Sequence, residues 1–333
     1  MNILMLGSGA WGTALANLLC ENGHHVILWN KNPARAEEMA RTRRNPRLKD
    51  VVLHGGMEFS ADFSAARGCE MVVFATPSFA IRETAAAVKP YLLDHVILVS
   101  VTKGIEAETG LRMTQIIEQE TGHLAAALSG PSHAEEVSRG IPTGCVAACA
   151  DISVAETIQD TFMNESFRVY ASTDVVGVEL SAAMKNVIAM CAGVIDGLGM
   201  GDNTKALLVT RGLTELARLV VAMGGRAETI AGLAGVGDMI VTCTSMHSRN
   251  RQAGILIGKG IAVNDAMEQV GAVVEGYYAA HSAFELAQKA GAEMPITQEA
   301  YLVLYKGKDP ADTIRSLMGR DKKHEFEDAG WQK

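Results

Sequence analysis

A lysine inside an apolar stretch is the residue of this 333-residue chain best suited to acid–base chemistry. Lys185 lies in the run 178–189, among alanine, methionine, valine and isoleucine residues whose spacing predicts a helix. Burial in such a helix would lower the pKa of the lysine into a range useful for proton transfer. The adjacent Asn186 could form hydrogen bonds nearby. The alternative interpretation is a lysine at the helix edge whose ammonium reaches solvent.

Two polar segments follow directly after predicted strands, where ligands of α/β proteins bind. Lys103, in the segment 101–104 (VTKG), follows the strand 96–100 and could meet a cofactor or a substrate. A solvated loop lysine fits that position equally well. The segment 129–134 (SGPSHA) closes the strand 125–129, and its small residues would let the backbone approach a ligand closely. Its spacing alone slightly favours a structural turn.

Two further segments carry charged side chains at predicted helix starts. Asp238, in the glycine-rich turn 233–239 (LAGVGDM), could cap a helix or pair with a catalytic lysine. Thr242 lies one helical turn further on, on the same face. The segment 247–251 (HSRNR) combines hydroxyl, guanidinium and amide groups before a helix, which suits a phosphate ligand. A capped helix with solvated arginines is the alternative.

A glycine-rich turn near the start of the chain predicts dinucleotide binding. The apolar strand 2–6 runs into Gly7, Gly9 and Gly12, and a helical pattern follows over 13–19. In a GxGxxG fingerprint the first glycine permits the turn, the second admits the pyrophosphate and the third lets the helix pack on the strand. The helix N-terminus would then hold the pyrophosphate. An ordinary glycine turn is the alternative.

The end of the second predicted strand bears on cofactor choice. NAD-specific folds of this type usually place Asp or Glu there, about 20 residues after the fingerprint, on the ribose 2′-hydroxyl. Here the strand ends in Asn30 and Lys31, with Arg35 close behind. These cations could attract a 2′-phosphate, so the loop predicts acceptance of NADPH alongside NADH. Alternatively, both cations are solvated and Asn30 holds a ribose hydroxyl.

The elements that must position these residues change in kind along the chain. After the strand 2–6, short apolar strands alternate with helical patterns, and they lie at 25–30, 71–75, 96–100, 125–129, 143–148 and 167–170. This alternation predicts a Rossmann-type, doubly wound and mostly parallel sheet with helices on both faces. From about residue 174 only helical patterns follow, at 178–189, 205–223, 250–257, 263–269, 276–289 and 295–305.

We therefore predict an α/β fold with two domains, a dinucleotide-binding domain over 1–175 and an all-helical substrate and catalytic domain over 176–333. The catalytic cleft is expected between the two domains.

Composition and charge narrow the function classes. With 48% hydrophobic and 20% charged residues, the chain reads as a soluble globular protein. A net charge of −8 argues against general binding to nucleic acid or anionic membranes. No uninterrupted apolar run has the length of a membrane span, and we expect no signal peptide. The six scattered cysteines form no CxxC pair, which favours reduced thiols in the cytoplasm.

Taken together, these segments resemble the bacterial-type NAD(P)-dependent glycerol-3-phosphate dehydrogenases, from Gly7 to about Asp309. The stretches that carry the resemblance are, in chain order, GSGAWGTALA, TKG, SGPSHAEE, ELSAAMKNVIA, GDNTKALLVTRGLTE, LAGVGDMIVTC, SRNR and VVEGY. A GxGxxG pattern alone is common to many dehydrogenases. The segments Lys185–Asn186 and 248–250 (SRN) distinguish this family from the others. The tail beyond Gly319 carries little of this signal, and no role is assigned to it.

The resemblance implies roles for individual residues. Lys185 matches the family's catalytic lysine, which also contacts substrate. The other substrate contacts that it implies are Lys103, Gly130, Ser132, Asp238, Ser248, Arg249 and Asn250. The cofactor contacts, with the fingerprint glycines included, are Gly7, Gly9, Trp11, Gly12, Lys31, Lys103, Ala134, Arg249, Val273 and Glu275. Trp11 departs from many relatives at a variable position. No metal site is expected.

The implied reaction is the reversible NADPH- or NADH-dependent reduction of dihydroxyacetone phosphate to sn-glycerol 3-phosphate. Lys185 would act as general acid and base, while Arg249 and Asn250 would bind the glycerol-phosphate group. The resemblance further implies a supply of glycerol phosphate for phospholipid synthesis. Besides a small-molecule substrate, the expected partner is a second copy of the chain in a homodimer.

The sequence leaves two alternative functions open. One is another two-domain dehydrogenase that acts on a hydroxy acid or an acyl-CoA. Acyl-CoA enzymes rely on a His–Glu pair, where this chain has a lysine. The other is a nucleotide-sensing protein without turnover, which would not need Lys185, Asp238 and Arg249 together.

Overall fold

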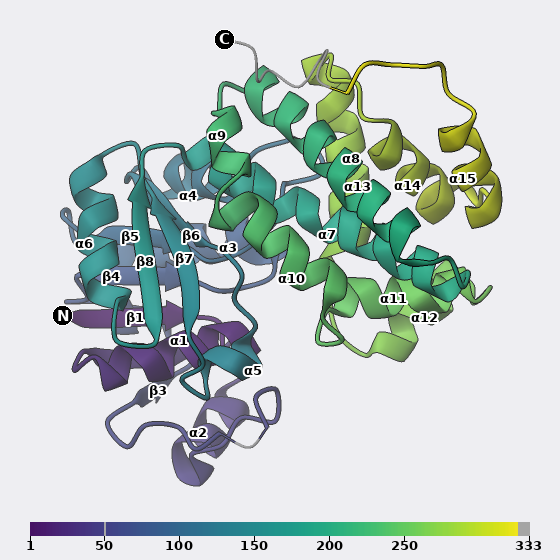
Figure 1. The fold of residues 1–333 in the computed structure, drawn as a ribbon. Helices are drawn as coiled ribbons and strands as arrows, with labels where there is room; N and C mark the ends of the chain where they lie inside the picture. Colours follow the sequence, from purple (N-terminus) through teal and green to yellow (C-terminus); the bar gives the residue numbers. More distant parts are fainter. Residues whose placement is uncertain (50, 326–333) are drawn as a thin grey trace. The chain divides into compact units, whose positions relative to one another are not determined.

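The computed structural model describes residues 1–49 and 51–325, and these form two compact units (Figure 1). The first unit comprises 1–102 and 113–175, and the second comprises 103–112 and the chain from 176 onward. The predicted division after 175 assigned 103–112 to the first domain, whereas the contacts of this segment lie in the second unit. Residues 326–333 of the predicted second domain lie outside the described residues.

The first unit is built on one eight-stranded sheet with the order β3-β2-β1-β4-β5-β6-β7-β8. All neighbouring strands in it are parallel except β6 and β7, so the predicted Rossmann-type, mostly parallel sheet is confirmed. The strands are β1 (Asn2–Leu6), β2 (His25–Trp29), β3 (Glu58–Ser60), β4 (Met71–Phe74), β5 (Ile97–Ser100), β6 (Ala125–Ser129), β7 (Thr143–Ala148) and β8 (Phe167–Ser172).

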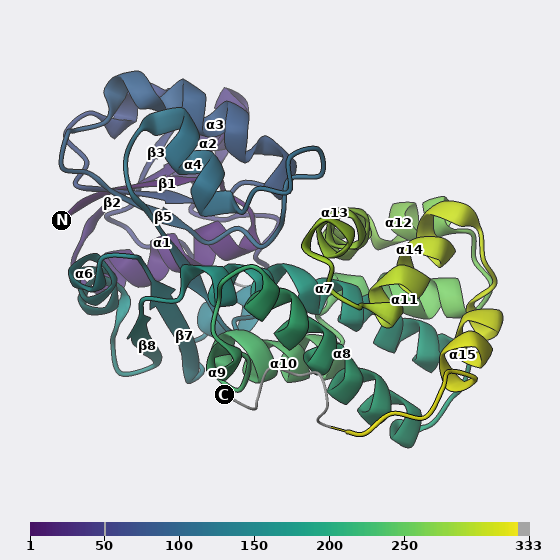
Figure 2. The same ribbon diagram turned by 90° about the horizontal axis from the view of Figure 1, so that it is seen from above.

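Burial explains why the strands could be recognised in the sequence. The central strands β4 and β6 are buried at every position, as expected where helices cover both faces of a sheet. In Figure 2, α3 (Ile81–Val88) and α4 (Met113–Thr121) lie on one face, and α1 (Ala10–Glu21) and α6 (Ile152–Phe162) lie on the other. The edge strand β8 alternates between buried and exposed residues at its start. The three-residue edge strand β3 was missed, because it has a single apolar residue and no buried position.

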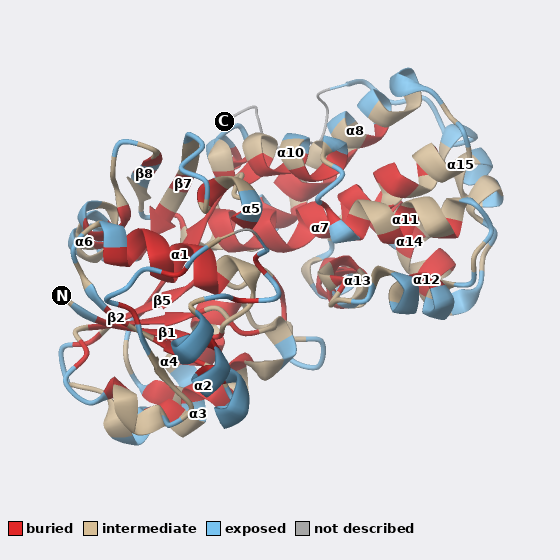
Figure 3. Cartoon of the chain, turned by 90° about the horizontal axis from the view of Figure 1, so that it is seen from below, coloured by how far each residue is buried: buried red, intermediate tan, exposed pale blue. Residues whose placement is uncertain are grey.

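In the second unit, the described residues from 176 onward form helices joined by turns and loops, and no strand follows Ser172 there, as predicted. The segment 103–112 of that unit is not helical. The central element of the unit is α7 (Val175–Gly197), which is buried without interruption from 177 to 190 (Figure 3). The helices that follow it include α8 (Asp202–Ala222), α10 (Asp238–Thr244), α11 (Arg249–Gly258), α12 (Val263–Val270), α13 (Glu275–Ala290), α14 (Pro295–Lys306) and α15 (Pro310–Met318).

Helices α7 and α11 pack with their backbones in contact. A Cβ atom on Gly193 would lie 2.1 Å from the carbonyl oxygen of Arg251, and one on Gly254 would lie 2.0 Å from that of Met190. Only glycine fits such an approach. This contact places the start of α11 beside the middle of α7, where Lys185 and Asn186 lie.

Helix α7 also has the length and apolar character of a membrane-spanning helix, with a mean hydropathy of 1.5 in an 18-residue window. However, 89% of that window is buried inside the structure, as in the core helix of a globular domain. The stretches 227–244 and 249–258 pass the same test together but are bent by 51°. These are the candidates found in the described part of the chain.

Candidate active site

Two lysines of the second unit share one buried carboxylate. Lys185 Nζ lies 2.5 Å from Asp238 Oδ1, and Lys103 Nζ lies 2.7 Å from Asp238 Oδ2. Lys185 is only 6% exposed, and Asp238 is only 1% exposed. Lys185 therefore belongs to the core, and its ammonium does not reach solvent at a helix edge.

Thr242 completes the cluster from the same helix as Asp238. The ammonium of Lys185 donates a hydrogen bond of 2.6 Å to Thr242 Oγ1, which in turn donates to the carbonyl of Asp238 at 2.6 Å. The spacing of four residues on α10 puts both side chains on one face. Asp238 is the first residue of α10 and its carboxylate binds lysines, while the helix has no side-chain cap. Of the two interpretations of Asp238, the structure supports pairing with a lysine.

Burial and charge oppose each other in this cluster. Burial lowers the pKa of Lys185 to about 8; the carboxylate of Asp238 counteracts the shift, and the charge of Lys103 adds to it. Burial alone would raise the pKa of Asp238, but the two lysine charges outweigh burial and lower it. Two ammonium groups on one carboxylate leave a net positive charge, which suits an oxyanion.

A chain of amide hydrogen bonds joins α7, α11 and α13 beside the lysine. Asn250 Nδ2 donates to Asn186 Oδ1 at 2.9 Å, and the backbone N–H of Gly276 donates to Asn250 Oδ1 at 2.9 Å. Both asparagines are buried. These hydrogen bonds fix the start of α11 and the start of α13, where Glu275 lies, relative to α7, which carries Lys185.

In the predicted phosphate-binding segment 247–251, some side chains make structural contacts and others are exposed. Ser248 is the N-cap of α11, and its Oγ accepts from Arg251 N at 3.2 Å. Arg251 pairs with Asp196 at 2.7 Å, whereas Arg249 is exposed. The interpretation as a capped helix therefore holds for Ser248, and Arg249 is the cation of this segment that a ligand can reach.

In the first unit, the glycine turn has the geometry that a dinucleotide requires. Gly7 adopts a φ of +119°, and a Cβ atom on Gly12 would lie 2.1 Å from the carbonyl oxygen of Gly7. A Cβ atom on Gly9 would meet nothing within 4 Å. Gly9 is the N-cap of α1, which has no side-chain cap and no acidic residue in its first turn. Open space before an uncapped helix N-terminus fits a pyrophosphate.

Other predicted cofactor contacts flank this turn. Trp11 Nε1 is buried without a hydrogen-bond partner among the described residues, so it has a donor to offer. Asn30 Nδ2 donates to Ser8 Oγ at 2.5 Å, and Asn30 Oδ1 accepts from Asn32 N at 2.8 Å. Lys31 is exposed. The β2 loop is thus ordered by Asn30, and its cation faces outward.

The segment 129–134 has a structural reason for its glycine. A Cβ atom on Gly130 would lie 2.7 Å from the carbonyl oxygen of Gly144, so the residue is needed where β6 meets β7. Ser132 Oγ donates to the carbonyl of Gly130 at 2.9 Å. Ala134 begins the short helix α5 (Ala134–Val137) and is buried. In the second unit, Val273 is half-buried just before α13.

The structure thus brings together Lys103, Lys185 and Asp238, and separately joins Asn186 to Asn250. Sequence reasoning noted Thr242 on the face of Asp238 without giving it a role. It missed the ion pair of Arg112 and Glu179, at 2.5 Å, for which no motif gave a signal. In the described part of the chain, no three His, Cys, Asp or Glu side chains gather as a metal site would require.

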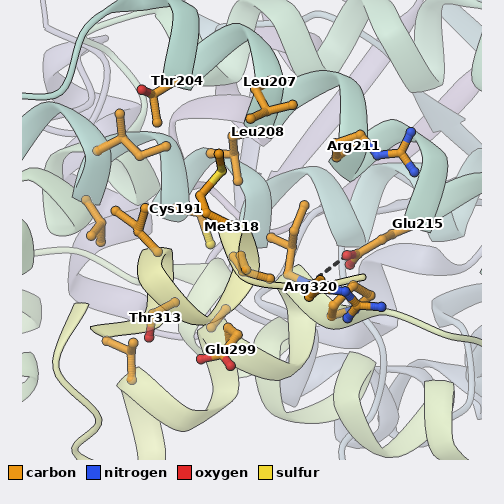
Figure 4. Close-up of a pocket in the computed structure, with 18 of the residues that line it drawn as sticks. Cys191, Thr204, Leu207, Leu208, Arg211, Glu215, Glu299, Thr313, Met318 and Arg320 are labelled. Atoms are coloured by element: carbon orange, nitrogen blue, oxygen red, sulfur yellow. Dashed lines mark hydrogen bonds between the residues drawn. The ribbon is translucent and has the colours of Figure 1, made fainter. Parts of the chain in front are cut away.

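A cavity of about 590 Å³ lies elsewhere in the helical unit, among α8, α14 and α15 (Figure 4). Its walls are largely apolar and include Leu207, Leu208 and Met318. Glu215 lines it and accepts hydrogen bonds from the backbone of Ile296 and Thr297 at the start of α14. Burial raises the pKa of Glu215 to about 7. The described residues that line this cavity include none of the predicted site residues.

A dinucleotide turn in one unit and a buried lysine–carboxylate cluster in a helical unit define a two-domain NAD(P)-dependent dehydrogenase. Two family profiles match, "NAD-dependent glycerol-3-phosphate dehydrogenase N-terminus" over residues 2–155 and "NAD-dependent glycerol-3-phosphate dehydrogenase C-terminus" over 174–315. The chain belongs to this family of glycerol-3-phosphate dehydrogenases.

Individual relatives agree along the full chain. The chain is similar to glycerol-3-phosphate dehydrogenase (NAD(P)+) of Moorella thermoacetica, with 50% identity over 332 residues that cover 99% of each chain. The counterpart in Thermoanaerobacter is 49% identical over 327 residues, covering 98% of this chain and 99% of the relative. The crystal structure of glycerol-3-phosphate dehydrogenase from Coxiella burnetii has a TM-score of 0.92 at 35% identity, covering 96% of this chain and 99% of that one.

Proposed function

We propose that this chain reversibly reduces dihydroxyacetone phosphate to sn-glycerol 3-phosphate with NADPH or NADH, and that Lys185 is the group that transfers the proton. The family supports the reaction. The observation that carries the role of Lys185 is its burial on Asp238 beside Lys103.

When bound, the nicotinamide supplies or accepts the hydride. During reduction, Lys185 Nζ gives a proton to the C2 oxygen of the substrate, and during oxidation it takes that proton back. The positive charge of Lys185 and Lys103 stabilises the oxyanion that develops at C2. Asp238 and Thr242 hold the ammonium in place through hydrogen bonds of 2.5 and 2.6 Å. The pKa of Lys185, at about 8, lets it work in both directions near neutral pH.

The remaining contacts are part of the same proposal. Substrate contacts are assigned to Lys103, Gly130, Ser132, Asp238, Ser248, Arg249 and Asn250. Cofactor contacts are assigned to the glycine turn with Trp11, and to Lys31, Lys103, Ala134, Arg249, Val273 and Glu275. We also propose a cytoplasmic homodimer that supplies glycerol phosphate for phospholipid synthesis. All six cysteines are free thiols, which supports a reducing compartment.

The direct test of the reaction is a mixture of the purified chain, a reduced nicotinamide cofactor and dihydroxyacetone phosphate. The expected result is loss of the absorbance of the reduced cofactor and appearance of sn-glycerol 3-phosphate. Turnover with a keto acid or a 3-ketoacyl-CoA in its place would contradict the proposed substrate. Cofactor binding without turnover of any of them would point to a nucleotide sensor.

Arg249→Ala is expected to weaken the handling of phosphorylated substrate. Loss of a charge-assisted contact costs on the order of 1.5–3 kcal/mol, which is roughly a 10- to 150-fold drop in kcat/KM. The measurement compares dihydroxyacetone phosphate with unphosphorylated dihydroxyacetone, which should be a poor substrate and less affected. An equal loss with both substrates would rule out a phosphate anchor. Arg251→Ala is not a matched control, because Arg251 pairs with Asp196.

Asn30→Asp is expected to shift cofactor preference toward NADH. The chain has no carboxylate at the end of β2, so NADPH should be used at least as well as NADH by the natural chain. A carboxylate there would repel the 2′-phosphate at short range. The measurement is kcat/KM for both reduced cofactors. Asn30→Ser is the control, because it also loses the hydrogen bond to Ser8 but adds no charge. An unchanged preference in Asn30→Asp would contradict the assignment.

A further inference from the structure

The segment 103–112, called the strap here, leaves the sheet of the first unit after β5 but packs into the helical unit. Its Ile105 is 5% exposed and belongs to the hydrophobic cluster of Leu180, Ala183 and Met184 on α7. The strap is thus attached to the helix that carries Lys185. Its first residue is Lys103, one of the two lysines on Asp238.

Hydrogen bonds inside the strap give it a defined shape. Ile105 and Arg112 form an antiparallel bridge, and Glu106 N donates to the carbonyl of Leu111 at 3.0 Å. Gly110 turns the chain at a φ of +74°. These contacts tie the two ends of the strap together, so the position of Arg112 and the position of Lys103 are linked.

An ion pair fixes the far end of the strap on α7. Arg112 Nη1 lies 2.5 Å from Glu179 Oε2, and the side chains are 13% and 4% exposed. A buried ion pair adds little net stability, because the cost of removing two charges from water offsets their attraction. Its best-attested effect is to select one arrangement over others, since displacing one partner leaves a buried charge alone.

We propose that the Arg112–Glu179 ion pair is a positioning device for the reaction: it locks the strap on α7 and thereby keeps Lys103 on the carboxylate of Asp238. Arg112 and Glu179 are positioning residues that act through Lys103 and do not touch substrate. The inference rests on the proposed function for its activity readout. Lys103 is the first residue of the strap, so the distance of its ammonium from Asp238 depends on where the backbone of the strap lies.

Loss of the ion pair has a consequence that a purely stabilising contact would not have. The groups facing Lys185 are Asp238, Lys103, Thr242 and the thiol of Cys243. The charge of Lys103 lowers the pKa of Lys185. When Lys103 moves away, the pKa of Lys185 must rise, and kcat/KM for reduction must stay high to a higher pH.

The experiment compares Arg112→Ala, Arg112→Lys and Glu179→Gln with the natural chain. Arg112→Ala is expected to lower kcat/KM by on the order of 10²-fold, the cost of a small misplacement at a reacting centre. The alkaline limb of its pH profile should move upward, and Arg112→Lys should restore both quantities in part. Lys308→Ala is the matched control, because it removes another partly buried ion pair of the same unit, with Glu299 at 2.6 Å.

A double-mutant cycle with Lys103→Ala decides whether Arg112 acts through Lys103. If it does, Arg112→Ala causes no further loss in the Lys103→Ala background. Additive losses would overturn the proposal, and so would an Arg112→Ala variant that is less stable but retains its kcat/KM and its pH limb. If Arg112→Ala fails to fold, Glu179→Gln and Arg112→Lys carry the same cycle.

The proposed function and this inference fail in distinguishable ways. If the natural chain does not reduce dihydroxyacetone phosphate, the proposed function fails, and the strap is tested by NMR titration of carbon-labelled lysine side chains. The pKa of Lys185 is then expected to rise in Arg112→Ala and in Lys103→Ala but not in Lys308→Ala. An unchanged pKa of Lys185 in Arg112→Ala would overturn the inference by itself.

Discussion

Lys185→Met is expected to lower kcat for the reduction of dihydroxyacetone phosphate by roughly 10²–10⁴-fold, the contribution of a positioned general acid. Methionine fills the same apolar space but carries no proton. Asp238 keeps its ion pair with Lys103 at 2.7 Å, so the fold and cofactor binding should survive. Single-turnover rates and cofactor titration measure the two effects separately.

The activity of the natural chain should depend on pH through the protonation of Lys185. Lys185 must be protonated for reduction and neutral for oxidation. With a pKa of about 8, it should make kcat/KM for reduction fall, and that for oxidation rise, as pH increases through that value. Both limbs should be absent in Lys185→Met. A mutant that keeps near-normal kcat would make Lys103 the candidate proton donor, and Lys308→Met is the control for loss of a lysine.

As pH rises, the free energy of unfolding should change in the opposite sense to the rate of reduction. The pKa of Lys185 is about 8 in the folded chain against 10.5 when unperturbed, so between these values the unfolded chain binds more protons. This group therefore makes the free energy of unfolding rise with pH from about 8 to 10.5. At neutral pH its buried ammonium is a cost, and Lys185→Met should be at least as stable as the natural chain. Denaturant unfolding at several pH values checks this.

Asp238→Asn is expected to destabilise the helical unit by on the order of 3 kcal/mol at neutral pH, because two ammonium groups would face a neutral amide. The carboxylate raises the pKa of Lys185, so its loss should move the alkaline limb of reduction below pH 8. Destabilisation should shrink as pH rises and the lysines lose their protons. Unfolding curves and pH profiles measure both effects.

The contribution of Asp238 to stability has its own pH window. Its pKa is lowered in the folded chain, so its stabilisation is present above the ordinary value near 3.8 and is lost as pH falls through the folded value. Asp238→Asn should lack this acid-dependent part. An Asp238→Asn variant with an unchanged alkaline limb would show that the carboxylate does not set the protonation of Lys185. Asp312→Asn is a suitable control, because that carboxylate is exposed and its ion pair with Arg315 lies on α15.

The sequence predicted the positions of helices and strands better than it predicted the contacts between them. Strands β6 and β7 were predicted at their observed bounds, because short runs of small and apolar residues between breaks indicate strands whatever their direction in the sheet. The short edge strand at 58–60 has no such signal. α15 was not predicted either, although Asp309 followed by Pro310 is a recognisable helix start.

The site was predicted as residue types, not as a geometry. An apolar helix with one lysine identified Lys185 and its burial, since local spacing carries that information. The contact of Lys103 with Asp238 joins residues 135 positions apart, and local patterns do not encode such a distance. Family resemblance supplied the residues, and the structure alone showed that they share one carboxylate. The spacing of the segment 129–134 slightly favoured a structural turn, and the close approach of the Gly144 backbone to Gly130 supports that interpretation.

The strap also ties the folding of the two halves of the chain to each other. Residues 103–112 are synthesised long before α7, yet Ile105 belongs to the apolar cluster that α7 completes. While the first half emerges from the ribosome, this isoleucine has no core to enter. A gene divided after residue 175 would give a helical fragment without Ile105, which belongs to its hydrophobic core, and without Lys103, one of the two lysines on Asp238. The two units are therefore compact bodies but not interchangeable modules, and recombination between relatives would need to exchange the strap together with the helices.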